Sequence, residues 1–348
     1  MSNPIKLGLV GIGRAGYNMH LRELKGKEDM IQIVAVCDIE ADRREKMQAE
    51  FGCRGYDKIE ELVLDPEVEV VDIATRSCDH FKHAKIALDA GKLVMLEKPM
   101  CTSYKEAEFL MKLADQDGKR RLFVRHNRRF EAKFMQVNRI IESGILGEVF
   151  MIKLARGGYE RRKDWQTLSQ YGGGQLLNWG PHIIDHSLQF CGGDYKNLTA
   201  HTRQIAAAGD CEDYIHAVFE GINGRIVQME ISGGTARKDR LPQYEIYGSK
   251  GTLVDNGDTF TLHYIDPACE LKELVAEIAT PSAKAGFAGE DAPNWITEEK
   301  VWDTNTLDHV WPALYEAVRN GVDYPIKSAE ALKVMETISE IKSQNAFF

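Results

Sequence analysis

Near its beginning the chain reads Ile5-Lys-Leu-Gly-Leu-Val10-Gly11-Ile12-Gly13-Arg14-Ala15-Gly16, and this stretch decides the fold of the first half. The aliphatic residues predict a buried strand, and the spacing from 15 to 24 predicts a helix. The three glycines permit a tight turn, close approach of backbone to a pyrophosphate and close packing of helix on strand. The predicted phosphate loop comprises Gly11, Ile12, Gly13, Arg14, Ala15 and Gly16.

A second strand is predicted over Ile31–Cys37, and it ends on Asp38. An acidic residue about twenty positions after the last glycine is typical of dinucleotide sites, where it binds the adenosine ribose hydroxyls. Because its carboxylate repels a 2′-phosphate, the sequence favours NAD over NADP. Arg43 and Arg44 lie close enough to keep NADP open, since an arginine can bind the extra phosphate.

Strands and helices continue to alternate up to residue 126. Strands are predicted at 68–74, 93–96 and 121–125, and helices at 57–64, 80–90 and 103–117. This alternation indicates an α/β domain over residues 1–126 with a doubly wound parallel sheet.

The second half has a different pattern, with many strands and few helices between them. Helices are predicted at 130–143, 306–320 and 328–341, whereas 270–299 gives no clear pattern. Strands are predicted at 148–155, 199–205, 214–220, 225–232, 243–247, 251–255 and 259–264. The pattern indicates an α+β domain over residues 127–348 with a large, mainly antiparallel open sheet.

An apolar strand ends on the charged sequence Glu97-Lys98-Pro99. Ligands of open parallel sheets bind at the carboxyl edge of the strands. A partly desolvated lysine at that edge can polarise a carbonyl or stabilise a developing alkoxide, and Glu97 supplies a countercharge. The alternative is a plain ion pair at a strand end.

A second chemical motif runs from Gly172-Gly-Gly174 to His186. Pro181 fits a first helical turn, so His182, Asp185 and His186 share one helix face. The helix N-terminus disfavours a charged imidazole and keeps His182 neutral, as a general base must be. Two alternatives are a structural histidine and a zinc pair of His182 and His186; no spacing singles out a third ligand, so no metal is predicted.

Two basic clusters remain. The cluster from Lys119 to Arg129 is explained by alternating strand faces and surface solvation. The other cluster lies in a glycine-bearing loop. Its aromatic rings could stack on a sugar, and its arginines could bind a carboxylate or phosphate. The alternative is that this segment is a mobile surface loop without a binding role. Its members are Arg156, Tyr159, Arg161, Arg162, Lys163 and Trp165.

Composition limits the function classes. A net charge of −9 argues against nucleic acid as the main partner. No apolar run approaches the ~18 residues that a membrane span needs, and no signal-peptide pattern is present. Seven cysteines without a Cys-x-x-Cys pair fit a reducing compartment, so the cytoplasm is the predicted location.

These motifs together resemble the Gfo/Idh/MocA family, named after glucose–fructose oxidoreductase, inositol dehydrogenase and a rhizopine-catabolism protein. The matching positions are Gly11 to Gly16, Asp38, Thr75, His80, Glu97-Lys98-Pro99, Gly172 to Gly174 and Gly180-Pro-His182-Ile-Ile-Asp185. The resemblance implies a Rossmann domain followed by an α/β domain, whose open sheet mediates the subunit contacts of a homodimer or homotetramer. It also implies NAD(P)-linked oxidation of a hydroxyl on a sugar, cyclitol or sugar derivative.

The resemblance assigns roles to individual residues. Lys98 touches the reacting hydroxyl, Glu97 lies near the nicotinamide, and the Lys98–Pro99 bond is often cis. His182 is the catalytic histidine, and Thr75 and His80 belong to the cofactor site. Where the family usually has an aspartate, four residues before the histidine, this chain has Asn178, which can orient a hydroxyl but cannot accept a proton.

The resulting hypothesis is an NAD-dependent oxidoreductase in which His182 takes the hydroxyl proton, Lys98 stabilises the alkoxide and Asn178 orients the substrate. A redox-neutral enzyme that keeps NAD bound during elimination or epimerisation is the alternative, and a non-catalytic dinucleotide sensor is disfavoured by the intact Lys98 and His182. The predicted substrate contacts are Lys98, Arg156, Trp165, Asn178, His182, Asp185 and His186, of which Asp185 and His186 could instead support their neighbours.

Overall fold

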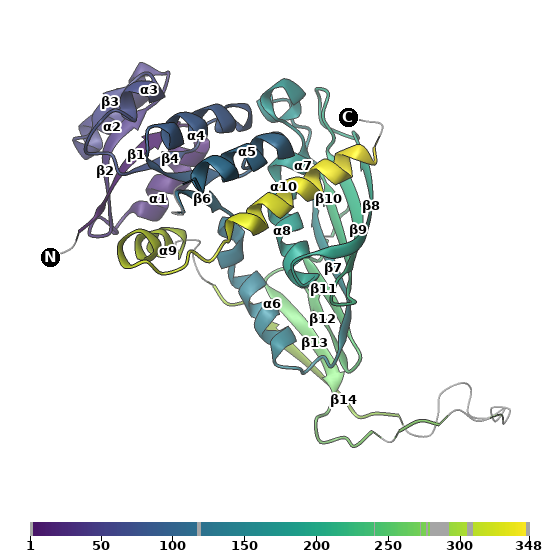
Figure 1. The fold of residues 1–348 in the computed structure, drawn as a ribbon. Coiled ribbons are helices and arrows are strands. Elements are labelled where there is room, and N and C mark those ends of the chain that lie inside the picture. The colour runs from purple at the N-terminus through teal and green to yellow at the C-terminus, as the bar shows by residue number, and fades with distance from the viewer. Residues whose placement is uncertain are drawn as a thin grey trace.

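The computed structural model describes residues 3–116, 120–239, 241–271, 273–275, 278, 292–304 and 309–345. Figure 1 shows two domains side by side, each built on its own sheet. Four parts of the sequence predictions lie outside the described residues. They are the predicted helix end at Asp117, Lys119 of the first basic cluster, the start of the helix predicted at 306–320 and much of 270–299.

The first sheet has six parallel strands in the order β3-β2-β1-β4-β5-β6. This is the strand order of dinucleotide-binding domains, and the order reverses between β1 and β4, where such ligands bind. The prediction of a doubly wound parallel sheet is therefore confirmed. The strands are β1 (Ile5–Val10), β2 (Ile31–Cys37), β3 (Arg54–Tyr56), β4 (Val70–Ile73), β5 (Leu93–Glu97) and β6 (Leu122–Arg125).

Helices cover both faces of this sheet. After the glycine loop the chain forms a π-helical turn, η1 (Gly16–His20), where a regular helix was predicted. The wider turn leaves His20 fully buried and within reach of Asp72 and Glu97. The other elements are α1 (Leu21–Leu24), α2 (Ala41–Phe51), α3 (Ile59–Leu62), η2 (Ser77–Asp79), α4 (His80–Asp89) and α5 (Tyr104–Ala114).

The second sheet has eight strands in the order β14-β13-β12-β11-β7-β10-β9-β8. All neighbours are antiparallel except β7 and β10, which are parallel, so the prediction of a mainly antiparallel sheet is confirmed. Among the strands of this second sheet, only β14 was not predicted; it begins in the stretch 270–299, which gave no clear pattern. The strands are β7 (Val149–Gly157), β8 (Tyr195–Arg203), β9 (Tyr214–Gly221), β10 (Ile226–Ser232), β11 (Tyr244–Gly248), β12 (Gly251–Asp255), β13 (Thr259–Ile265) and β14 (Trp295–Val301).

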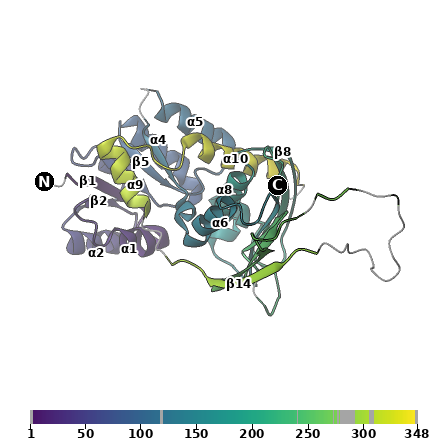
Figure 2. The ribbon, with the colours of Figure 1, turned by 90° about the horizontal axis from the view of Figure 1, so that it is seen from below.

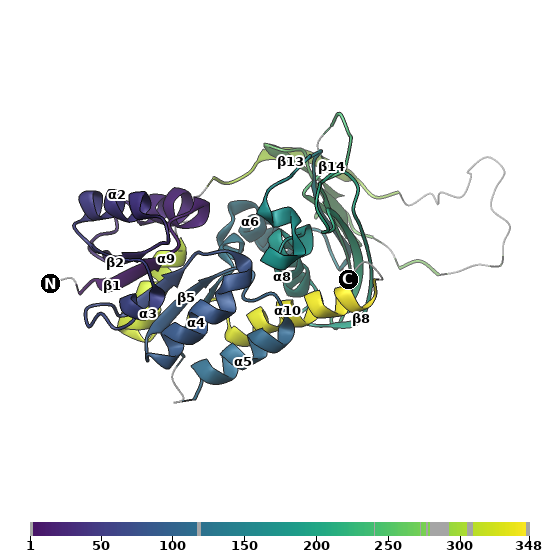
Figure 3. The ribbon, with the colours of Figure 1, turned by 90° about the horizontal axis from the view of Figure 1, so that it is seen from above.

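One face of the second sheet is covered by α6, α8 and α10, whereas the described chain leaves the other face bare (Figures 2 and 3). Phe150 and Trp295 are each about half exposed, so large apolar side chains remain in contact with solvent. The helical elements of this half are η3 (Asn127–Phe130), α6 (Ala132–Glu142), η4 (Trp165–Thr167), η5 (Ser169–Tyr171), α7 (Gln175–Asn178), α8 (Gly180–Phe190), α9 (Val310–Tyr315), η7 (Glu316–Asn320) and α10 (Ser328–Ser343).

The C-terminal segment joins the two domains. Helix α10 packs against both α5 and α8, and Trp311, Leu314 and Tyr324 belong to the same buried cluster as Leu7 and Leu9 of β1. A division at residue 126 therefore separates the two sheets, while α9 and the residues that follow it up to Ile326 complete the core of the first domain. Within the described residues, no helix is both long enough and apolar enough to cross a membrane.

Candidate active site

The glycine loop after β1 has the geometry that a phosphate loop needs. Gly11 has a φ of +92°, and a Cβ at Gly16 would lie 2.1 Å from the Gly11 oxygen, so both positions exclude a side chain. A Cβ at Gly13, in contrast, would have no neighbour within 4 Å. The open space at Gly13 fits a pyrophosphate approaching the backbone, and the residues present therefore fit a dinucleotide.

Asp38 lies at the carboxyl end of β2, beside this loop. Its Oδ2 accepts a hydrogen bond from the Ile12 N–H at 2.7 Å, which fixes the carboxylate and the loop together. The Arg43 guanidinium lies 3.4 Å from the carboxylate, and Arg44 donates to the Asp38 backbone oxygen at 2.6 Å. One acidic group and two arginines thus surround the place where the adenosine ribose is expected.

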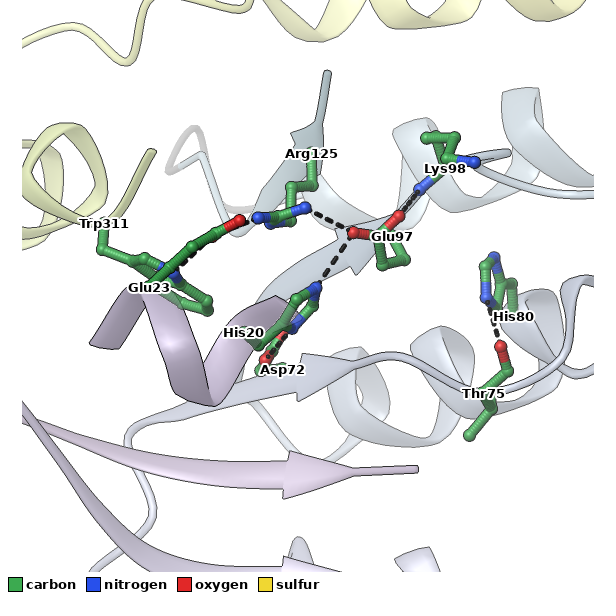
Figure 4. A network of polar contacts seen from close by, with 9 residues as sticks. All are labelled: His20, Glu23, Asp72, Thr75, His80, Glu97, Lys98, Arg125 and Trp311. Carbon is green, nitrogen blue, oxygen red and sulfur yellow. Dashed lines mark hydrogen bonds and ion pairs between the residues drawn. The ribbon is translucent and has the colours of Figure 1, made fainter. Parts of the chain in front are cut away.

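The turn after β5 carries the predicted lysine. The Lys98–Pro99 peptide bond is cis, as the family resemblance implied. His80 is buried and donates from Nδ1 to the Pro99 oxygen at 2.7 Å, so it supports this turn. Its Nε2 lies 3.2 Å from the Thr75 backbone oxygen (Figure 4). The Thr75 hydroxyl lies 3.1 Å from His83 Nδ1, and its Cγ2 lies against Gly11.

Lys98 connects the two domains. Its Nζ donates a hydrogen bond of 3.0 Å to the backbone oxygen of Asn178, at the end of α7. Burial lowers the pKa of Lys98 to about 8, although the Glu97 carboxylate partly opposes that shift. Lys98 is therefore a cation near neutral pH, yet one that releases its proton more easily than an exposed lysine.

A buried network of charges holds Glu97, and the sequence did not indicate it (Figure 4). Glu97 Oε1 accepts hydrogen bonds from Arg125 Nη1 at 2.6 Å and from His20 Nε2 at 2.9 Å. His20 Nδ1 donates to Asp72 Oδ2 at 2.7 Å, while Arg125 also pairs with Glu23. Trp311 of the C-terminal segment donates to Glu23 at 3.0 Å.

This network keeps both His20 and Glu97 charged. Burial alone would lower the pKa of His20, but the Asp72 and Glu97 carboxylates together outweigh it and raise the pKa to about 9. Burial would likewise raise the pKa of Glu97, yet the Arg125 guanidinium holds it far below its usual range. Arg125 is fully buried, so surface solvation, which was expected to explain part of its basic cluster, does not explain this arginine.

The glycine run of the second domain sets the position of Asn178. A Cβ at Gly172 would lie 2.8 Å from the Thr102 side chain, so the loop passes directly against the first domain. Glu212 then caps the next helix, because its Oε1 accepts from the Leu176 N–H at 2.7 Å. Burial raises the pKa of Glu212 to about 7. These contacts hold α7 in place, with the Asn178 oxygen on Lys98.

His182 lies in the first turn of α8 and is 5% exposed. Its Nδ1 is buried and has no hydrogen-bond partner among the described residues. Burial holds the pKa of His182 well below its ordinary value, and the charges of Lys98 and Arg128 lower it further. His182 is thus neutral, as predicted, but mainly through burial rather than through the helix N-terminus.

Asp185 and His186 support the site instead of lining it. The Asp185 carboxylate accepts two hydrogen bonds from Arg129, at 2.6 and 2.7 Å. His186 donates from Nε2 to the Arg128 oxygen at 3.1 Å, while its Nδ1 faces the Tyr244 hydroxyl at 3.3 Å. Because these partners occupy both ring nitrogens, His186 has no nitrogen left to bind a metal. The described residues also contain no group of three or more His, Cys, Asp or Glu side chains that could hold a metal ion.

The aromatic ring beside the site is Trp179, not the predicted Trp165. Its ring centroid lies 5.6 Å from that of His182, and the Arg156 guanidinium carbon lies 3.1 Å from its centroid. Arg156 is thus the member of its loop cluster that contacts this ring, whereas Arg162 pairs with Asp164 and lines a hollow together with Asn178. Trp165 begins η4 and lines neither of two neighbouring hollows.

The fold and the site together define a dinucleotide-binding oxidoreductase with a second, C-terminal domain. Residues 5–126 match the model of an oxidoreductase family with an NAD-binding Rossmann fold, and residues 134–254 match the GFO/IDH/MocA C-terminal domain. The chain therefore belongs to the Gfo/Idh/MocA family of oxidoreductases.

Similar proteins come from several bacteria. The uncharacterised oxidoreductase YdgJ of Escherichia coli is 28% identical and aligns over 97% of this chain and 95% of its own length. The NADP-dependent scyllo-inositol 2-dehydrogenase IolW of Bacillus subtilis is 29% identical over 73% of this chain and 70% of its own. Among solved structures, the oxidoreductase yvaA of Bacillus subtilis superposes with a TM-score of 0.83 at 22% identity, covering 99% and 97% of the two chains.

Proposed function

We propose that this protein is an NAD-dependent dehydrogenase that acts on the CH–OH group of a sugar, cyclitol or sugar derivative. The observation that carries this proposal is the hydrogen bond between Lys98 Nζ and the Asn178 oxygen. It brings the end of β5 and the helices α7 and α8 into one site, beside the phosphate loop. Inositol dehydrogenases among the relatives support a polyhydroxylated substrate.

The bound nicotinamide would supply the hydride acceptor, and the chain's own residues would handle the proton. His182 is neutral and accepts the hydroxyl proton. Lys98 carries the positive charge that stabilises the alkoxide as it forms, in a buried setting that strengthens the attraction. Asn178 orients the substrate, and Glu97 remains a fixed carboxylate because Arg125 and His20 hold it.

The direct test is a panel of polyhydroxylated alcohols with each nicotinamide cofactor. Inositols, aldoses, sugar acids and nucleotide sugars are incubated with NAD or NADP, and absorbance of the reduced cofactor at about 340 nm is followed. We expect NAD reduction with at least one of these classes. Reduction by none of them, with intact cofactor binding, would refute the dehydrogenase proposal.

A second candidate function is redox-neutral sugar chemistry with a permanently bound NAD. Asn178 favours it, because no carboxylate stands there to stabilise a charged His182 during net proton release. Mass spectrometry of the purified, denatured protein distinguishes the two. One equivalent of NAD that survives extensive dialysis supports the redox-neutral reaction, whereas freely exchanging NAD supports the dehydrogenase.

The pH dependence follows from the two catalytic groups. Since Lys98 must be charged and its pKa is about 8, kcat/KM for alcohol oxidation should fall above about pH 8. His182 is neutral throughout this range because its pKa lies well below 6.5, so no loss is expected between pH 6.5 and 8. A rate that instead rises through pH 8 to a plateau would show that neutral Lys98 is the base.

Cofactor preference should depend on the charge of Asp38. Asp38→Asn keeps an oxygen for the Ile12 N–H but removes the charge that repels a 2′-phosphate. The NAD-to-NADP ratio of kcat/KM should fall by about tenfold or more. Asp42→Asn, on the exposed face of α2, should leave the ratio unchanged. Equal use of both cofactors by the unmodified protein would instead place Arg43 at the 2′-phosphate.

The bare face of the second sheet supports one further proposal, that the chain forms a homodimer or homotetramer. Phe150 and Trp295 are exposed on strands β7 and β14, and burial of such side chains favours association. Light scattering of the purified protein measures the assembly mass.

A further inference from the structure

His20 is a buried histidine outside the set of proposed catalytic residues. It is the last residue of the π-helical turn η1, which begins at the final glycine of the phosphate loop. Its side chain is fully buried, and its ring lies edge-on to that of Trp311, with the ring centroids 5.5 Å apart (Figure 4). A polar side chain that is removed from solvent must find its hydrogen-bond partners within the protein.

Both ring nitrogens of His20 contact a carboxylate. Nδ1 lies 2.7 Å from Asp72 Oδ2, and Nε2 lies 2.9 Å from Glu97 Oε1 (Figure 4). A neutral imidazole has one N–H and one lone pair, whereas an ionised carboxylate can only accept hydrogen bonds. A neutral ring would therefore direct a lone pair at a carboxylate oxygen. Both contacts are satisfied when both nitrogens carry a proton.

The charges around His20 favour the same state. They belong to neighbouring strand ends and to helix α1, and the residues are Asp72, Glu97, Arg125 and Glu23. With a protonated His20, these three carboxylates face two cations, and the adjacent Lys98 ammonium is a third. A neutral His20 would leave one buried carboxylate without a cation, which is strongly unfavourable. Although burial opposes it, the Asp72 and Glu97 carboxylates raise the pKa of His20 to about 9.

The Glu97 carboxylate connects this network to the catalytic lysine. Its Oε1 accepts hydrogen bonds from His20 and Arg125, at 2.9 and 2.6 Å, while its Oε2 accepts from the backbone N–H of Lys98 at 3.0 Å. The carboxylate therefore cannot rotate without breaking its bond to the Lys98 backbone. From this fixed turn the Lys98 side chain reaches the Asn178 oxygen, 3.0 Å from its Nζ.

We propose that His20 is a positioning residue, a doubly protonated imidazolium that fixes the Glu97 carboxylate and thereby the direction of Lys98. This inference rests on the proposed dehydrogenase function, in which Lys98 stabilises the developing alkoxide. That role requires an ammonium group held in place beforehand, because a group that must reorient during the reaction stabilises the alkoxide less.

The protonation state of His20 can be measured without turnover. Long-range ¹H–¹⁵N correlation spectra of the full-length protein with added NAD, labelled with ¹⁵N-histidine, show whether each ring nitrogen carries a proton. The spectrum of His20→Gln identifies the signal. We expect two protonated nitrogens at about pH 7.5, where a histidine with an ordinary pKa of about 6.5 is mostly neutral. A neutral His20 at this pH would overturn the inference.

His80 is the internal control for this measurement. It is also buried, and both of its ring nitrogens lie near oxygens, but these are the uncharged backbone oxygens of Pro99 and Thr75. Burial lowers the pKa of His80, so its ring should be neutral under the same conditions. The contrast between the two histidines isolates the effect of the charged partners.

Variants separate positioning from packing. His20→Gln keeps a donor for only one of the two carboxylates and removes the positive charge. At the same pH it should lower kcat by about tenfold or more, as expected when a catalytic group is displaced. It should also move the fall of kcat/KM to higher pH, because Lys98 keeps its proton more easily when a nearby cation is removed. His201→Gln, on the exposed part of β8, should leave both quantities unchanged.

A second substitution should rescue this variant. In His20→Gln with Asp72→Asn, the new asparagine can donate to the new glutamine, which donates to Glu97, and the net charge of the network returns to its original value. Both kcat and the pH dependence should largely recover. An unchanged kcat in His20→Gln, or a loss without rescue and without a shift in pH dependence, would show that His20 only fills space and would overturn the inference.

The outcomes also distinguish this inference from the proposed function. If the protein oxidises no alcohol, the dehydrogenase proposal fails. A doubly protonated His20, and a pKa of Lys98 that rises in His20→Gln, would still support the link between the two residues, since NMR measures both. Oxidation of an alcohol by a protein with a neutral His20 would refute this inference alone.

Discussion

Replacing Lys98 by methionine should lower kcat for alcohol oxidation by about 10²- to 10³-fold, the usual cost of losing one donor to a developing oxyanion. Methionine keeps the length and the packing of the side chain but removes its charge and its hydrogen bond to the Asn178 oxygen. Steady-state kinetics with a substrate from the panel measures the loss. The cofactor Kd should change little, because the phosphate loop and Asp38 lie on other strand ends.

Two companion variants make this prediction specific. Lys98→Arg retains a cation that does not titrate below pH 12, so residual activity should no longer fall above pH 8. His182→Asn should lose about 10²- to 10⁴-fold, since it removes the base. Turnover similar to that of the unmodified protein in both Lys98→Met and His182→Asn would refute the assigned mechanism.

Arg125→Met should destabilise the protein by about 3 to 5 kcal/mol, which is typical when one partner of a buried ion pair is removed. Arg125 is fully buried and bonded to both Glu97 and Glu23, so its loss leaves Glu23 without a cation and Glu97 with His20 alone. Urea unfolding followed by tryptophan fluorescence gives the free energy of unfolding. We also expect loss of activity, because Glu97 loses its main partner beside the catalytic lysine.

An exposed ion pair provides the control. Lys85 and Asp89 pair on α4 with side chains 42% and 46% exposed, and Lys85→Met should cost less than about 1 kcal/mol. The double variant Arg125→Met with Glu97→Gln should be less destabilised than the sum of the two single variants, because it also removes the buried negative charge that Arg125→Met leaves on Glu97. A cost below about 1 kcal/mol for Arg125→Met would show that the network contributes little to stability.

Local patterns were sufficient to predict the two sheets. Alternation of apolar strands with helices specifies a parallel sheet, and strands joined by short turns specify an antiparallel one, so neither prediction needed distant contacts. The chemical motifs at Lys98 and His182 were found for the same reason, since each is contained in a few consecutive residues. Strand β3 was missed because it has only three residues and includes a glycine.

The buried network was not predicted because its members are far apart in sequence. His20 and Glu97 are separated by 77 positions, and Arg125 and Glu23 by 102. One local signal existed: Asp72 interrupts an otherwise apolar strand, and a carboxylate buried in this way needs a partner. The choice of Trp179 over Trp165 likewise depended on three-dimensional packing, since both tryptophans follow polar or glycine-rich residues.

The hydrogen bond from Lys98 to the Asn178 oxygen crosses from one domain to the other, and it therefore links the acidity of the lysine to domain movement. If the two domains separate, water reaches the ammonium group and its pKa returns towards that of an exposed lysine. When they close, the same group becomes a stronger acid. Closure around a bound substrate would thus remove water from the ammonium group and strengthen its attraction to the developing alkoxide, and ¹⁵N NMR of the Lys98 side chain with and without a bound ligand would measure the change in pKa.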